Sequence, residues 1–129
     1  MKRIYTIVVF CILVGQIKAQ VNTDELNRLL DSGKNSLSSG NRKEAIMTFD
    51  KAIRASKTKN FKEGSPDVYM RIGDICLNIP HSNCNICLAH SYYTRSRDID
   101  PKNEMIWKKL DDERFKSMKT QDDYCNQCD

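Results

Sequence analysis

Apolar residues recur at helical spacing in five stretches of the chain, and short polar or glycine-containing segments separate these stretches. The first stretch, residues 22–39, carries regularly spaced leucines and opens on Asn22 or Thr23, either of which is a favourable N-cap. Asn41 is placed to cap the second stretch, and Glu44 follows it at the spacing of a capping box. The first half of the chain is therefore expected to form two consecutive helices.

A polar connector, residues 58–65, leads to the third stretch, which opens on Pro66, a residue tolerated in the first turn of a helix. Pro101 separates the fourth and fifth stretches, residues 84–99 and 103–119, because proline cannot continue the helix that it follows. The sequence has no alternating apolar and polar run bounded by turn residues, so strands have little support. The pattern predicts an all-α domain of roughly five helices.

The central segment between Pro66 and Pro101 has its small and apolar residues where two antiparallel helices would face each other. These residues are Tyr69, Ile72, Gly73, Cys76, Ala89, Tyr93 and Ser96. Gly73 and Ala89 permit the two helices to approach closely, and Pro101 closes the unit. The segment resembles a tetratricopeptide repeat, whose pattern is W-x2-L-G-x2-Y, then A-x3-F and a closing proline.

The flanking segments resemble the same repeat less completely. Leu29, Ser32 and Gly33, followed by Ala45, Phe49 and Ala52, fit a first repeat without the closing proline. Trp107 and Leu110 fit the start of a third repeat, in which Asp111 stands where the glycine is expected. We expect residues 103–119 to form the capping helix that a stack of repeats needs at its end. The resemblance implies a short solenoid of stacked antiparallel hairpins.

Tetratricopeptide repeats bind proteins or peptides without chemistry, and the first helix of each repeat lines the concave face of the stack. The resemblance therefore implies a binding surface made of three rows of side chains. The rows are Asn27, Leu30, Lys34 and Leu37; Asp67, Met70, Asp74 and Leu77; and Met105, Lys108, Asp112 and Phe115.

The partner expected on these rows is an extended or helical peptide with alternating apolar anchors and some basic character. The basic character follows from the second row, which carries two acids. The alternative is that Leu30, Leu37 and Leu77 pack against neighbouring helices, so that no groove is open.

Cys84 and Cys87 form one C-x2-C pair, Cys125 and Cys128 form another, and Cys76 stands alone. If the C-terminal residues return to the helix that starts near Cys84, all five sulfurs meet at one end of the stack. Three interpretations remain open. Disulfides stabilise small exported domains by about 2–4 kcal/mol each. Paired C-x2-C motifs also suit a zinc site, and a thiol near a helix N-terminus suits redox chemistry.

Residues 1–19 have the pattern of a secretory signal, with Lys2 and Arg3 before an apolar run and a small residue, Ala19, at the expected cleavage site. The mature protein would consist of a helical domain, residues 20–120, and a cysteine-bearing C-terminal segment, residues 121–129. Removal of the signal lowers the net charge from +4 to +1, so the mature chain has no electrostatic signature of nucleic-acid binding. We expect a secreted or periplasmic protein without a membrane span after cleavage.

No catalytic motif is present in the sequence. The acidic runs, such as Asp111 to Glu113, are typical of solvated surfaces, and glycine-rich phosphate loops, G-x-S-x-G and H-E-x-x-H are missing. The predicted function is therefore a protein-interaction scaffold that is not an enzyme and needs no cofactor. The alternative function is a cysteine-cluster module, with structural zinc or redox-active thiols, carried on the helices.

Overall fold

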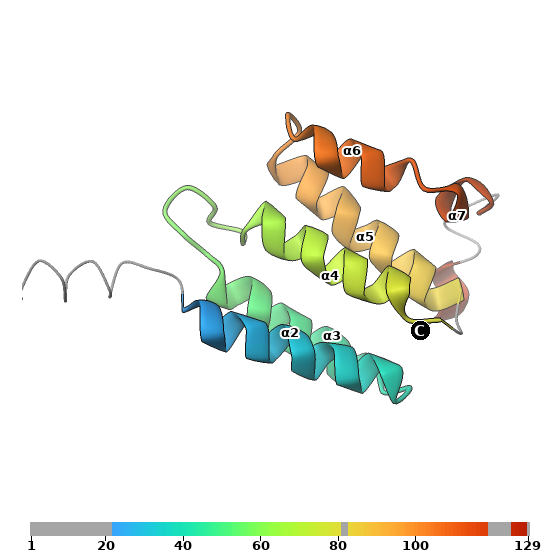
Figure 1. Cartoon of the computed structure of the whole chain (residues 1–129), viewed down its shortest axis with the longest axis horizontal. Coiled ribbons are helices and arrows are strands. Elements are labelled where there is room, and N and C mark those ends of the chain that lie inside the picture. Colours follow the sequence, from blue (N-terminus) through green and yellow to red (C-terminus); the bar gives the residue numbers. More distant parts are fainter. Residues whose placement is uncertain (1–21, 81–82, 119–124, 129) are drawn as a thin grey trace, which may run out of the picture.

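The computed structural model describes residues 22–80, 83–118 and 125–128, and these residues form six α-helices without a strand (Figure 1). The all-α prediction is confirmed. The expected signal, residues 1–19, lies outside the described residues. In chain order the helices are α2 (Thr23–Ser38), α3 (Arg42–Ala55), α4 (Pro66–Asn78), α5 (Asn83–Ile99), α6 (Glu104–Leu110) and α7 (Glu113–Lys116), followed by a short 3₁₀ turn, η1 (Asn126–Cys128).

The predicted helix starts are correct, although one cap differs. The side chain of Asn22 accepts a hydrogen bond from the backbone N–H of Glu25 at 3.2 Å, so Asn22 is the N-cap of α2. Asn41 precedes α3, but its side chain makes no capping bond to the backbone and instead donates to the Glu44 carboxylate at 2.6 Å. The expected capping box is therefore replaced by a contact between two side chains.

The predicted capping helix, residues 103–119, is wrong in its extent, because the chain breaks into α6 and α7. Asp112 has an extended backbone, with φ −61° and ψ 137°, and its side chain accepts the N–H of Arg114 at 2.9 Å. An aspartate that bonds a nearby backbone N–H competes with helix continuation. The two adjacent acids that were assigned to a helix surface thus end one helix and start the next.

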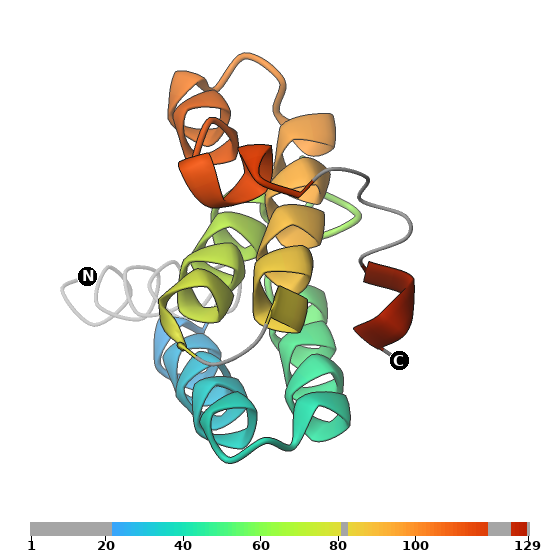
Figure 2. The same cartoon turned by 90° about the vertical axis from the view of Figure 1, so that its right-hand side faces the viewer.

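The helices are arranged as two antiparallel hairpins followed by α6. Helices α2 and α3 pack against each other, α4 and α5 pack against each other, and α4 also contacts both helices of the first hairpin. Helix α6 packs on α5. Figure 2 shows α2, α4 and α6 following one another in one layer, with α3 and α5 in a second layer beside it.

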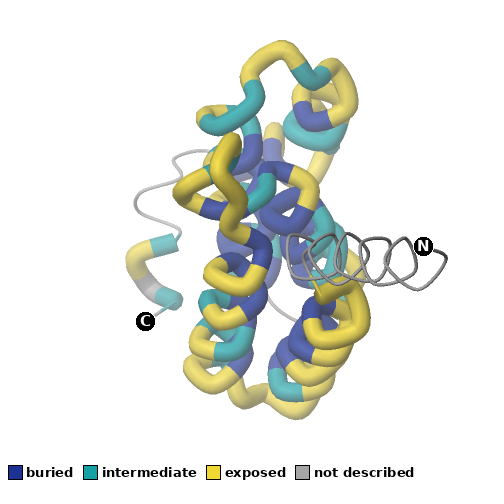
Figure 3. Tube along the Cα trace, turned by 90° about the vertical axis from the view of Figure 1, so that its left-hand side faces the viewer, coloured by how far each residue is buried: buried dark blue, intermediate teal, exposed yellow. Residues whose placement is uncertain are grey.

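The same close contact holds each hairpin together. A methyl group added at Gly33 would lie within 3.0 Å of three ring atoms of Phe49, and one added at Gly73 would lie as close to the ring of Tyr93. Ala45 and Ala89, one turn before these aromatic residues, are completely buried. Figure 3 shows that burial follows the facing sides of the helices. The two hairpins therefore repeat one packing arrangement, in which an aromatic ring lies on a glycine of the neighbouring helix.

Replacing Gly73 by Ala should lower the free energy of unfolding by about 1–3 kcal/mol, because the added methyl overlaps the ring of Tyr93. Alanine otherwise stabilises a helix interior relative to glycine by about 0.5–1 kcal/mol, so the sign of the change separates crowding from helix propensity. Urea denaturation measures the difference. A Gly73→Ala protein that is as stable as the wild type would show that α4 and α5 do not cross this closely.

Candidate functional site

The three predicted rows lie on α2, α4 and the α6–α7 segment, but their apolar members are mostly inside the protein. Leu30, Leu37, Met70 and Phe115 are between 3% and 7% exposed and belong to the core. They cannot contact a partner in this conformation, so the alternative of packing against neighbouring helices holds for Leu30 and Leu37. These four residues therefore belong to the core and not to the accessible surface of the three helices.

The other eight residues of the rows remain accessible to different degrees. Met105 is 57% exposed and is the one large apolar side chain of the rows that lies open to solvent. Four polar residues are exposed and three residues are half-buried. The exposed residues are Asn27, Lys34, Asp67 and Lys108, and the half-buried ones are Asp74, Leu77 and Asp112. The surface is therefore more polar than the sequence predicts.

Two polar bridges connect successive helices of this layer. The Arg71 guanidinium of α4 donates to Asn27 Oδ1 of α2 at 2.8 Å, and Lys109 Nζ of α6 donates to Asp74 Oδ1 of α4 at 2.8 Å. Asp74 also accepts the Tyr93 hydroxyl at 2.5 Å. Burial, together with this bond to Asp74, raises the pKa of Tyr93, so the hydroxyl stays a donor. Lys109 therefore neutralises Asp74, one of the two acids of the second row from which a basic peptide was predicted.

Arg114 fixes the segment between α6 and α7 to the end of α4. Its Nε and Nη2 donate to the two carboxylate oxygens of Asp112 at 2.9 and 2.8 Å, and its Nη1 donates to the Leu77 carbonyl at 3.2 Å. These bonds to the guanidinium hold the pKa of Asp112 at about 2, below its ordinary value. Asp112 is thus occupied by an internal ion pair rather than offered to a ligand.

A hollow of about 360 Å³ lies where α4, α5 and α6 meet, and we refer to it as the α4–α6 hollow. Its lining includes four of the twelve predicted residues. The complete lining is Asp74, Leu77, Asn78, Tyr93, Lys108, Lys109 and Asp112. The sequence predicted Tyr93 as a core residue and omitted Asn78 and Lys109, because a row chosen by helical steps samples only one line of each helix face.

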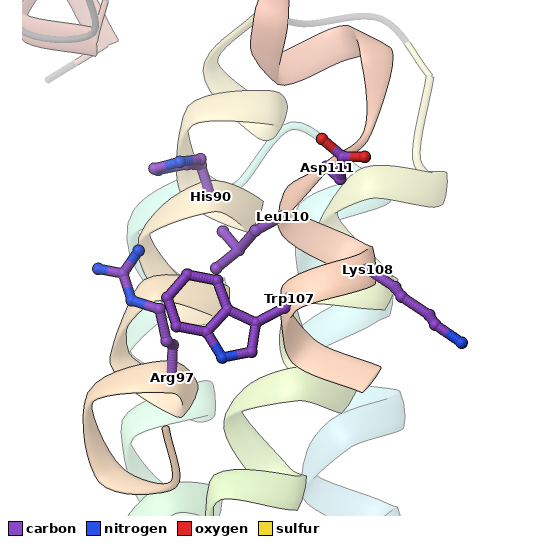
Figure 4. A pocket seen from close by; sticks show the side chains of 6 residues that line it. All are labelled: His90, Arg97, Trp107, Lys108, Leu110 and Asp111. Atoms are coloured by element: carbon purple, nitrogen blue, oxygen red, sulfur yellow. The ribbon is translucent and has the colours of Figure 1, made fainter. Parts of the chain in front are cut away.

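A second hollow, of about 470 Å³, lies on the other side of α6 and is shown in Figure 4. Trp107 occupies its centre and is 50% exposed. The indole Nε1 donates to the Pro101 carbonyl at 2.8 Å, and the Arg97 guanidinium lies 5.4 Å from the ring centroid. His90 and Arg97 extend from α5 beside it, whereas Lys108 points away. The indole therefore fixes the turn between α5 and α6.

The C-terminal residues return to α5, as the cysteine spacing predicts. Cys84 is bonded to Cys128 and Cys87 to Cys125, with Cα–Cα distances of 5.4 and 5.7 Å. Cys76 is completely buried and is not in a disulfide, and burial raises its pKa to about 12. The disulfide interpretation is confirmed for the two C-x2-C pairs. The described part of the chain contains no group of three or more His, Cys, Asp or Glu side chains that could hold a metal ion.

The disulfide-bonded C-terminal turn, residues 125–128, also touches the first hairpin. The Arg42 guanidinium, at the start of α3, donates to the Cys128 carbonyl at 2.8 Å. Figure 2 shows this turn on the side of the α3–α5 layer that faces away from α2 and α4. The turn thus joins the second helices of the two hairpins and leaves the opposite layer open.

Comparison with family models, with curated proteins and with solved structures gives no match. Across the described residues, each helix is too short or too polar to cross a membrane.

Replacing Cys125 and Cys128 together by Ser should lower the melting temperature by several degrees under oxidising conditions, because two covalent links to α5 are lost. In reductant the variant and the wild type should melt at nearly the same temperature. Differential scanning calorimetry with and without a phosphine reductant tests both statements. Equal melting temperatures without reductant would mean that the links do not contribute to stability.

Asp112 should make stability depend on pH in the acid range. Its pKa is lower in the folded protein than in the unfolded chain, so its contribution is complete above about pH 4 and is lost as the pH falls toward 2. The melting temperature of Asp112→Asn should be below that of the wild type near neutrality, and the gap should close between pH 4 and 2. Asp67→Asn, on exposed α4 surface, is the matched control. A gap that stays constant down to pH 2 would contradict the ion pair.

Proposed function

We propose that this protein is an interaction scaffold that binds a peptide or protein segment on the layer formed by α2, α4 and α6. The observation that carries the proposal is the α4–α6 hollow, whose lining includes half-buried Leu77 of α4 and exposed Lys108 of α6. Exposed Met105 lies one turn before Lys108 on α6. An apolar contact next to a charge is typical of surfaces that anchor peptides.

The repeated packing of the two hairpins supports a tetratricopeptide-like stack. The glycine and the aromatic residue that meet in each hairpin, Gly33 with Phe49 and Gly73 with Tyr93, hold corresponding positions of the repeat pattern. Helix α4 contacts both helices of the preceding hairpin, as stacking of repeats requires. In such a stack the first helices line the binding face, which corresponds to α2, α4 and α6 here.

The charges on this face change the expected ligand. Lys109 neutralises Asp74, one of the two acids of the second row, so the argument for a basic peptide now depends on exposed Asp67 alone. Asp112 of the third row is paired with Arg114. Lys108 is exposed and forms no ion pair with any other described residue. The ligand that fits this face has an apolar side chain for Leu77 in the α4–α6 hollow, a carboxylate for Lys108, and a further apolar group for Met105, which lies outside the lining of the hollow.

The disulfides and the signal-like residues 1–19 together support a proposal for the compartment in which the protein acts. Two disulfides are compatible with an oxidising environment, where such bonds persist. We therefore place the binding function in a secreted or periplasmic setting. The absence of any catalytic motif in the sequence favours binding over chemistry.

A matched pair of variants tests the binding face. Peptides are selected from a displayed random library against the oxidised wild type, and their affinities are measured for Met105→Glu with Lys108→Glu and for Met47→Glu with Lys51→Glu. Met47 is 56% exposed on α3, in the opposite layer, so the second variant makes similar changes away from the proposed face. The first variant should bind at least about tenfold more weakly, a loss of roughly 1.4 kcal/mol, and the second should bind unchanged.

Circular dichroism verifies that both variants keep their helices. Equal affinities in the wild type and both folded variants would place binding elsewhere, and weaker binding only in the α3 variant would assign it to the opposite layer.

A further inference from the structure

The four cysteines of the two disulfides connect the start of α5 to the C-terminal turn, residues 125–128. The first cysteine of each C-x2-C motif is paired with the last cysteine of the other, so the two motifs run in opposite directions. Their Cα–Cα distances across the pairs are 5.4 and 5.7 Å. Within a motif, residues three apart on a helical turn are separated by about 5–6 Å between Cβ atoms. Cys84 and Cys87 lie at the start of α5, and each is bonded to a cysteine of the C-terminal turn, so the four side chains start close together.

We propose that, after both disulfides are reduced, Cys84, Cys87, Cys125 and Cys128 bind one Zn²⁺ ion as four thiolates. Zinc prefers four tetrahedral thiolates at about 2.3 Å, which places neighbouring sulfurs about 3.8 Å apart. The Cα–Cα distances of 5.4 and 5.7 Å are short enough for side-chain rotation to bring the two sulfurs of each pair to that separation. Two C-x2-C motifs are also the spacing in which zinc ligands commonly occur.

Each of the two protein disulfides is reduced by one dithiol molecule, which gives it two electrons and two protons. The dithiol is itself oxidised to a disulfide in this step. The four protein thiols then release four protons as they bind the zinc ion. The thiolate is the metal ligand, and a sulfur in a disulfide is not a thiolate, so disulfide formation and zinc binding by the same four cysteines exclude each other.

Two features of the surroundings favour the negatively charged thiolate site. Cys84 lies in the first turn of α5, where the helix dipole stabilises a thiolate. The Arg42 guanidinium donates to the Cys128 carbonyl at 2.8 Å, so a positive charge is held beside the cluster. Groups of this kind around a metal site tune its affinity.

The consequence is that the C-terminal turn is tied to α5 in both oxidation states. Disulfides hold it under oxidising conditions, and zinc holds it when the chain is reduced. This site goes beyond the proposed peptide binding and does not depend on it, because the α4–α6 hollow contains none of the four cysteines.

The test uses the full protein reduced with a phosphine under inert gas. Cobalt(II) is added first, because four thiolates around it give strong visible ligand-field absorption, and zinc is then added to displace it. We expect this absorption with one metal ion per chain by elemental analysis, loss of the absorption on adding zinc, and no bound metal in the oxidised protein. Zinc should also raise the melting temperature of the reduced protein by several degrees.

Three variants make the result specific. Cys76→Ser should bind cobalt as the wild type does, Cys125→Ser with Cys128→Ser should lose the four-thiolate absorption, and Arg42→Gln should bind several-fold more weakly. Reduced wild type that shows no four-thiolate absorption, whether or not it keeps its helices by circular dichroism, would overturn the proposal. So would absorption that depends on Cys76, or that persists without Cys125 and Cys128.

Discussion

The contact between a glycine of one helix and an aromatic ring of the next determines the rest of this structure. Because Gly33 and Gly73 lack side chains, the rings of Phe49 and Tyr93 lie where a Cβ atom would otherwise be, and the helices of each hairpin approach closely. Such tight packing leaves little freedom in how the two helices cross. The hairpins consequently have similar geometry, and similar units can stack in two layers (Figure 2).

Tyr93 connects this packing to the candidate site. Its ring lies on Gly73 of α4, and its hydroxyl donates to the next residue of that helix, Asp74, which also accepts a hydrogen bond from Lys109 of α6. The same tyrosine therefore fixes the α4–α5 crossing and one wall of the α4–α6 hollow. In the first hairpin Phe49 has no hydroxyl, and among the described residues only the second hairpin joins its aromatic contact to a polar bridge of this kind.

The parts of the fold that could be predicted from sequence are those governed by local pattern. Leucine spacing, the Asn22 cap and Pro66 gave the helices and their starts, and the C-x2-C spacing indicated that the chain end returns to α5. The break at Asp112 was missed because it depends on Arg114 bonding both the carboxylate and the distant Leu77 carbonyl. Burial of Leu30 and Met70 was missed because helical spacing alone does not show how widely the neighbouring helix covers a face.

The central claim is that the α2, α4 and α6 layer binds a peptide at the α4–α6 hollow. The most direct measurement is a titration of the isotope-labelled, oxidised protein with a selected peptide, followed by amide chemical shifts. The account predicts that the largest shifts lie at the end of α4, around Leu77 and Asn78, and on α6 around Lys108, with α3 unchanged. Shifts concentrated on α3, or around Trp107 in the second hollow, would contradict it.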